Sequence, residues 1–292
     1  MIYGFLNIDK PKGFTSFDVV AKLRKIFDIK KIGHLGTLDP MATGVLVVAI
    51  GEATKLIEFI NNSEKTYEAE ITLGETSDTY DAEGKITKVS NKKPSLKTLK
   101  DALNKFKGEI LQIPPIHSAI KIKGKKAYQL ARKGTKIEMK ARKVNIFLIK
   151  LMDFDYPKVK ILVHCSAGTY IRSIANDLGE ELNAGAYLSG LKRTEVGDFK
   201  IKNSVNISNI AKSNYKKFII PVEKIAKSFP SIILNDIEYR KLNFGQMILR
   251  EDIKDDIDIF AGFFKNRFAG ILERVRIGKE ILLKFRKKLN LE

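Results

Sequence analysis

The order of hydrophobic and polar positions along the chain predicts a mixture of helices and strands. Residues 19–27 repeat apolar side chains at helical spacing behind Thr15 and Ser16, which are typical of a helix start. Residues 67–73 alternate apolar with polar side chains, as a half-exposed strand does. The same reading predicts strands over residues 45–50, 144–151 and 159–165, and helices over residues 96–106 and 171–182. Because the elements follow no regular strand–helix–strand rhythm, we expect an α+β fold.

The pattern changes near Phe229. From there, short apolar pieces are separated by polar or glycine-containing turns, which favours a small β-rich domain over residues 229–292. The pieces are residues 232–234, 247–249, 260–264, 268–272 and 281–285. Residues 1–228 then form a larger N-terminal domain, an organisation that the length of 292 residues allows.

Charge adds a partner to this picture. The chain has 53 Lys and Arg against 34 Asp and Glu, a formal net charge of +19. Such an excess favours nucleic acid, an anionic membrane or another polyanion as partner, and a general lysine bias is the alternative. Residues 230–292 hold 13 basic and 10 acidic residues, so the positive charge belongs mainly to the N-terminal part.

The segment from Lys121 to Lys143 is the most basic part of the chain. It holds ten Lys and Arg and a single acid, Glu138, with Tyr128 and glycines between them. A basic, glycine-punctuated insertion between structured elements is typical of an arm that grips phosphates. A solvated loop that serves solubility is the alternative.

Several classes of protein and site are excluded by composition. Cys165 is the only cysteine, so no intrachain disulfide can form, which suits a reducing compartment. The N-terminus does not read as a signal peptide, and no apolar run reaches the ~20 residues needed to cross a bilayer. The three histidines lack metal-ligand spacing, and no dinucleotide or phosphate-loop motif is present. We therefore expect a soluble intracellular protein that uses no cofactor and no metal.

The segment from Gly33 to Pro40 carries the leading candidate for chemistry. It places Asp39 in a glycine-flanked turn before the buried strand predicted over residues 45–50. Taken alone, an Asp-Pro pair is more typical of a helix cap. Two further segments favour chemistry instead, namely residues 165–172, which carry Tyr170 and Arg172, and residues 65–67.

Together these segments resemble the TruB family of tRNA pseudouridine synthases, whose members isomerise uridine 55 in the TΨC arm of tRNA. The resemblance rests on several long motifs in the family's order and covers most of the chain. The matching residues are 6–13 with 15–16, 33–44, 51–55, 65–67 with 73–74 and 79, 114–121, 168–172 and 191–194. It implies a catalytic domain with a mixed, largely antiparallel sheet flanked by helices. Residues 229–292 resemble, more weakly, the small PUA-type RNA-binding domain of that family.

The resemblance implies a role for three residues in catalysis. Asp39 matches the family's nucleophilic aspartate, which attacks either the uracil ring or the sugar carbon. Arg172 matches the arginine that pairs with this aspartate, and such a pair favours the charged carboxylate. Tyr67 matches the aromatic residue that stacks on the target base.

Further matches imply contacts with RNA. His34 matches a histidine near the flipped nucleotide, and Tyr170 and Leu191 match residues that line the pocket. Lys10 belongs to the first motif and is interpreted as structural, and His117 is given no role.

The resemblance thus predicts an isomerase in the cytoplasm that acts as a monomer on tRNA without cofactor or metal. Two alternatives stay open. The basic surface would equally suit a non-catalytic RNA-binding protein or tRNA chaperone. A relative that acts on ribosomal RNA under a guide RNA is the other, although the basic segment and the small C-terminal domain favour the stand-alone form.

Overall fold

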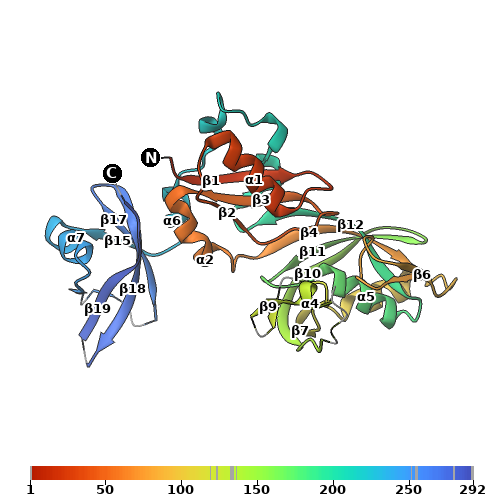
Figure 1. The fold of residues 1–292 in the computed structure, drawn as a ribbon. Coiled ribbons are helices and arrows are strands. Elements are labelled where there is room, and N and C mark those ends of the chain that lie inside the picture. Colours follow the sequence, from red (N-terminus) through yellow and green to blue (C-terminus); the bar gives the residue numbers. More distant parts are fainter. Residues whose placement is uncertain are drawn as a thin grey trace.

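The computed structural model describes residues 2–290, apart from residues 119, 123, 132–134, 136, 251, 254–255 and 279. A ten-stranded sheet forms the larger part of the molecule (Figure 1). Its main path runs through β14 (Val205–Asn206), β1 (Gly4–Lys10), β3 (Thr43–Ile50), β12 (Ala186–Val196), β4 (Lys65–Leu73), β11 (Lys158–Cys165), β10 (Arg142–Asp155) and β7 (Gly108–Gln112). Off this path, β2 (Ile32–Leu35) pairs with β3, and β13 (Phe199–Lys200) pairs with β12.

Two of the strand pairs in this sheet are parallel, β1 with β14 and β3 with β12, and the other pairs are antiparallel. The prediction of a mixed, largely antiparallel sheet is therefore confirmed. The alternating segment over residues 67–73 lies within β4, where Tyr67, Ala69 and Ile71 are buried and Glu68 is exposed.

Three helices cover one face of the sheet and share its main apolar cluster. They are α1 (Ser16–Phe27), α3 (Leu96–Asn104) and α5 (Ile171–Glu181). Thr15 caps α1 in a capping box with Asp18, and Ser95 caps α3, so both predicted helix starts are confirmed.

The opposite face of β1 and β3 is covered as well. A second apolar cluster joins these strands to the 3-10 turn Gly51–Leu56, to α2 (Ile57–Ile60), to α6 (Val222–Ala226) and to the C-terminal sheet. A strand that is buried on both faces needs apolar side chains in both directions. This explains the unbroken apolar run over residues 45–50, all of which are buried.

The C-terminal sheet stands beside α2 and α6 (Figure 1). Its strand order is β15 (Ser231–Leu234), β17 (Ile259–Phe264), β18 (Arg267–Ile277), β19 (Glu280–Lys288) and β16 (Ile248–Leu249). Each predicted apolar piece contributes a strand, which confirms the β-rich character of this part. The helix α7 (Asp236–Asn243) was not predicted, although Asn235 and Glu238 form a capping box at its start. The expected boundary between residues 228 and 229 falls between α6 and β15 and stays a prediction.

The remaining elements are short. They comprise β5 (Glu75–Ser77), β6 (Ile86–Lys88), β8 (Lys121–Ile122), β9 (Lys125–Lys126), α4 (Ala127–Ala131) and the 3-10 turns Ile201–Asn203, Ile207–Asn209 and Tyr215–Phe218. In the predicted basic arm, residues 123, 132–134 and 136 lie outside the described residues. Among the helices of the described chain, none combines the length and the apolar character that crossing a membrane requires.

Candidate active site

Asp39 lies in the turn that joins β2 to β3. The amide of Ala42 donates to the carbonyl of Asp39 at 3.0 Å, and the chain then enters β3 at Thr43. The residues after Asp39 form a turn and not a helix. The helix-cap alternative is therefore wrong, because the sheet takes up the chain before a helical turn can form.

Two residues from the first motif, Lys10 and Ser16, form hydrogen bonds with the backbone of this turn. The Ser16 hydroxyl accepts from the amide of Leu38 at 2.9 Å and donates to its carbonyl at 3.1 Å. The Lys10 ammonium is fully buried and donates to the carbonyls of Phe14 at 2.5 Å and Pro40 at 3.4 Å. Burial lowers the pKa of Lys10 to about 8, although the charge of Asp39 opposes this change. Lys10 thus supports the turn, in line with its structural interpretation.

Arg193 is 1% exposed and forms hydrogen bonds with the backbone at the two ends of the turn. Its Nε donates to the carbonyl of Val45 at 2.8 Å, and its Nη2 donates to the carbonyl of Gly36 at 3.0 Å. The backbone of Arg193 also lies against Gly44, where an added Cβ would come within 2.2 Å of its carbonyl oxygen. The close approach of β12 to β3 therefore requires a glycine at this position.

Arg172, the second residue of α5, reaches the Asp39 carboxylate. Its Nε lies 3.2 Å from Asp39 Oδ2, and its Nη1 donates to Asp81 Oδ2 at 2.9 Å. Its Nη2 donates to the backbone carbonyl of His117 at 3.1 Å. The Nε makes no hydrogen bond within the described part of the chain, so its contact with Asp39 is an ion pair. Asp81 and His117 thus fix the guanidinium with its Nε directed at Asp39.

Opposing influences act on the Asp39 carboxyl. Burial raises its pKa above the ordinary value, Arg172 lowers it, and the like charge of Asp81 raises it further. Although 35% of the Asp39 side chain is exposed, the groups packed around it remove much of its hydration. Arg172 is therefore the main group that favours the ionised form.

Asp81 was missed by the sequence analysis. Its side chain is 2% exposed and carries three further constraints in addition to Arg172. The Thr79 hydroxyl donates to Oδ1 at 2.6 Å, the Glu83 amide donates to Oδ1 at 3.0 Å, and its backbone forms a bridge with Leu188. The sequence signal is a group of acids, Asp78, Asp81 and Glu83, around the matched position Thr79, and the sequence does not show which of them contacts Arg172.

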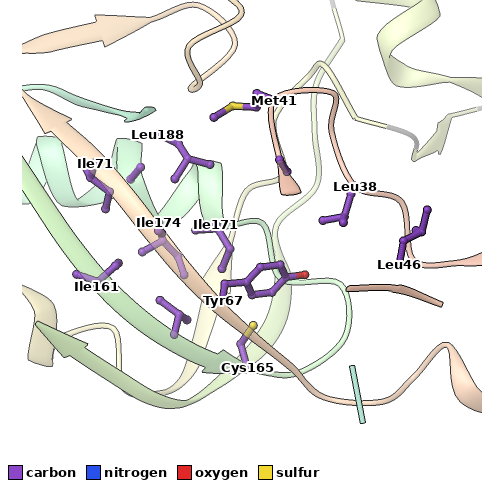
Figure 2. Packing of buried hydrophobic residues seen from close by; sticks show 14 of the residues in the cluster. Leu38, Met41, Leu46, Tyr67, Ile71, Ile161, Cys165, Ile171, Ile174 and Leu188 are labelled. Carbon is purple, nitrogen blue, oxygen red and sulfur yellow. The ribbon is translucent and has the colours of Figure 1, made fainter. Parts of the chain in front are cut away.

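Tyr67 is a buried residue of β4. Figure 2 shows it among buried apolar residues that include Ile171 and Cys165, and it is 7% exposed. It lies opposite Arg193 in the pairing of β4 with β12, and burial raises the pKa of its hydroxyl, which keeps it protonated. Leu191 lies on β12, two residues before Arg193 and opposite Ala69, and is partly buried.

The two other predicted contacts with RNA are His34 and Tyr170. His34 is partly buried on β2, opposite Val48. Tyr170 is the N-cap residue of α5, and the guanidinium of Arg142 stacks over its ring at 4.8 Å. The structure thus brings Asp39 and Arg172 into direct contact. The other predicted residues lie on β4 (Tyr67), on β12 (Leu191), on β2 (His34) and at the start of α5 (Tyr170).

The described residues contain no group of three or more His, Cys, Asp or Glu side chains that could hold a metal ion. The chemistry that the site itself offers is a carboxylate held against a guanidinium, beside a buried phenol. Such a carboxylate is suited to nucleophilic attack when it is ionised.

Known proteins are similar to this chain in sequence and in fold. A family profile described as the TruB family pseudouridylate synthase N-terminal domain matches residues 24–171. A tRNA pseudouridine synthase B of Clostridium tetani is 43% identical over 283 residues, which span 96% of this chain and 98% of that protein. A protein of the same name from Clostridium acetobutylicum is 46% identical over 239 residues, 82% of each chain. Among solved structures, a chain from a Cbf5–Nop10–Gar1 complex superposes with a TM-score of 0.75 at 25% identity, covering 98% of this chain and 84% of that one.

Proposed function

This chain belongs to the TruB family of pseudouridylate synthases, and on this premise we propose that it converts uridine 55 in the TΨC arm of tRNA into pseudouridine. The observation that carries the proposal is the Asp39 carboxylate, 3.2 Å from an arginine that is itself fixed by Asp81. The relatives from both Clostridium species carry the name tRNA pseudouridine synthase B, which supports tRNA as the substrate.

The reaction is an isomerisation, so atoms balance without a co-reactant. The bond from N1 of uracil to the sugar C1′ breaks, and a bond from C5 to C1′ forms. The proton on C5 leaves, and N1 takes up a proton. In the proposed mechanism ionised Asp39 attacks either the ring or C1′, holds the intermediate while the base turns, and is released at the end.

The proposed role of Arg172 follows from its geometry. A nucleophilic carboxylate must be ionised, and burial of Asp39 acts against ionisation. The guanidinium offsets part of this penalty and directs Nε at one carboxylate oxygen. Because Asp81 and His117 fix the guanidinium before RNA arrives, little reorganisation is needed at the moment of reaction.

A base in a folded RNA arm is stacked and must be extruded, which costs a few kcal/mol. We assign Tyr67 to stacking on the extruded base, Tyr170 and Leu191 to the lining of the pocket, and His34 to a contact with the RNA near the flipped nucleotide. The basic segment over residues 121–143 supplies phosphate contacts that offset part of the extrusion. We also propose that the chain acts in the cytoplasm as a monomer, with its catalytic domain ending near residue 228.

The test is conversion of unmodified tRNA, with pseudouridine mapped by position. We expect wild-type protein to modify position 55 alone, and Asp39→Asn to abolish conversion while binding tRNA within threefold of wild type. Asp153→Asn is the matched control, because this exposed carboxylate lies on β10 and pairs only loosely with Lys160 at 3.8 Å. Near-normal conversion by Asp39→Asn would falsify the assignment of the nucleophile.

The same assay separates the alternatives. A non-catalytic RNA-binding protein or chaperone would bind tRNA without forming pseudouridine. The second alternative is a synthase that needs a guide RNA, and the chain of similar fold was solved in a complex with Nop10 and Gar1. Such a protein would not modify a bare hairpin of the size of a tRNA arm, whereas the proposed function requires that it does.

A further inference from the structure

Gln112 is an unusual residue for its position in the fold. It ends β7, the edge strand of the large sheet, and it is the only buried residue among the five of that strand. Its side chain is 0% exposed. A buried primary amide is costly unless its donors and acceptor are satisfied, so its partners indicate why it is there.

Both ends of the amide bind one residue, Tyr170, which lies 58 positions further along the chain. Gln112 Nε2 donates to the carbonyl of Tyr170 at 3.0 Å, and the amide of Tyr170 donates to Gln112 Oε1 at 2.8 Å. Tyr170 is the N-cap of α5, and its own side chain makes no capping hydrogen bond. Gln112, on β7, therefore fixes the start of α5 with side-chain hydrogen bonds, as the N-cap side chain does in many helices.

The contacts continue along the chain on both sides. The Ser173 hydroxyl donates to the carbonyl of Ile113 at 2.8 Å, and Arg172 donates to the carbonyl of His117. The segment from Gln112 to His117 thus binds three of the four residues 170–173 at the start of α5. This segment leads directly into the basic segment over residues 121–143.

The other end of the basic segment returns to the same place. Arg142 lies opposite Gln112 in the pairing of β10 with β7, and its guanidinium stacks on the ring of Tyr170. The chain near both ends of the basic segment therefore contacts Tyr170: Gln112 binds its backbone, and Arg142 stacks on its ring. Arg172 follows two residues later on the turn that Tyr170 begins.

We propose that Gln112 is a positioning residue for the reaction. Its amide holds the first turn of α5, and with it the guanidinium of Arg172, in register with Asp39. It also connects the position of this turn to the two ends of the basic segment that we propose binds RNA. The inference rests on the proposed function and adds a residue that never touches the substrate.

The test separates the rate of the chemical step from RNA binding. Gln112→Leu removes both hydrogen bonds at similar volume, and Gln112→Glu keeps the shape and the acceptor but loses the donor. We expect both variants to form pseudouridine about 100-fold more slowly at saturating hairpin RNA, the loss that a small misplacement of a catalytic group produces. We expect the dissociation constant for a hairpin with cytidine at the target position, which cannot isomerise, to change less than threefold.

The matched control is Asn7→Leu. Asn7 is another buried amide, 3% exposed, whose Nδ2 donates to the carbonyl of Lys200 at 2.8 Å, far along the chain from α5. The single-turnover amplitude reports the folded fraction of each variant, so instability does not register as a slower rate. The proposal is overturned if the Gln112 variants keep a rate within threefold of wild type, or if Asn7→Leu slows the reaction as much. An inactive wild type would instead count against the proposed function.

Discussion

Replacing Asp81 with asparagine is the sharpest test of how the site is held together. The Asp81 side chain is 2% exposed and gives Arg172 its shortest contact with a carboxylate, 2.9 Å from Oδ2. Its Oδ1 accepts from Thr79 and from the amide of Glu83. An asparagine can keep the Oδ1 contacts, but it then turns its amide donors toward the guanidinium, which also donates.

The expected loss follows from burial. Removing one partner of a buried ion pair costs about 3–5 kcal/mol, because the other charge stays buried. Arg172 keeps Asp39 at 3.2 Å, so we expect the low end, a fall of about 3 kcal/mol in the free energy of unfolding. We also expect the catalytic rate to fall about 100-fold, because the guanidinium loses the contact that orients it.

Urea unfolding measures the first quantity, and release of tritium from uridine labelled at C5 measures the second, since that hydrogen leaves in the reaction. Glu52→Gln is the control. Glu52 also bridges two cations, Lys31 at 2.7 Å and Lys55 at 2.5 Å, but their side chains are 49% and 33% exposed. Its loss should cost less than about 1 kcal/mol and leave the rate unchanged. An Asp81→Asn variant that behaved like this control would refute the reasoning.

Three further outcomes are expected. Because burial raises the pKa of Asp39 and its ionised form is the proposed nucleophile, the rate should rise with pH through a pKa above 3.8, and Arg172→Met should move this rise to higher pH; a single-turnover pH profile with its acid limb at or below 3.8 would contradict this. Burial lowers the pKa of Lys65 from 10.5 to about 8, so between these pH values the unfolded chain binds more protons and the free energy of unfolding should increase with pH. In urea unfolding, Lys65→Met should reduce this increase by up to about 3 kcal/mol, and a variant that keeps the full increase would be inconsistent with the reasoning. Gly44→Ala would place a Cβ 2.2 Å from the carbonyl oxygen of Arg193 and should destabilise by about 3 kcal/mol or more, whereas Gly108→Ala, with a similar positive φ but open space, should cost about 1 kcal/mol; equal losses would show that backbone strain and not the close approach decides.

Local physics explains why much of the fold could be predicted from the sequence. The alternation over residues 67–73 and the cap at Thr15 depend on neighbours in sequence, and both appear where expected. The unbroken apolar run over residues 45–50 indicated a buried strand for the same reason. Asp39 and Arg172 were expected from family motifs and lie in contact.

The supporting residues could not be predicted in this way. Asp81, Gln112 and Arg193 are polar side chains whose partners lie 91, 58 and 157 positions away in the chain. The spacing of apolar residues along the chain does not indicate such a partner, because the pairing depends on how the sheet brings distant strands together. His117 illustrates a second limit, since its contribution comes from a backbone carbonyl that any residue would supply.

The long reach of Arg193 to Gly36 has a consequence for how the protein is made. Asp39 leaves the ribosome early, but Arg193, which binds Gly36 at the start of its turn and Val45 just after it, emerges only with β12. Arg172 and Asp81 likewise come after Asp39 in the order of synthesis. A nascent or truncated chain that lacks β12 therefore carries Asp39 without the hydrogen bond from Arg193 to its turn. Activity should appear late in translation and all at once, rather than grow with the length of the chain.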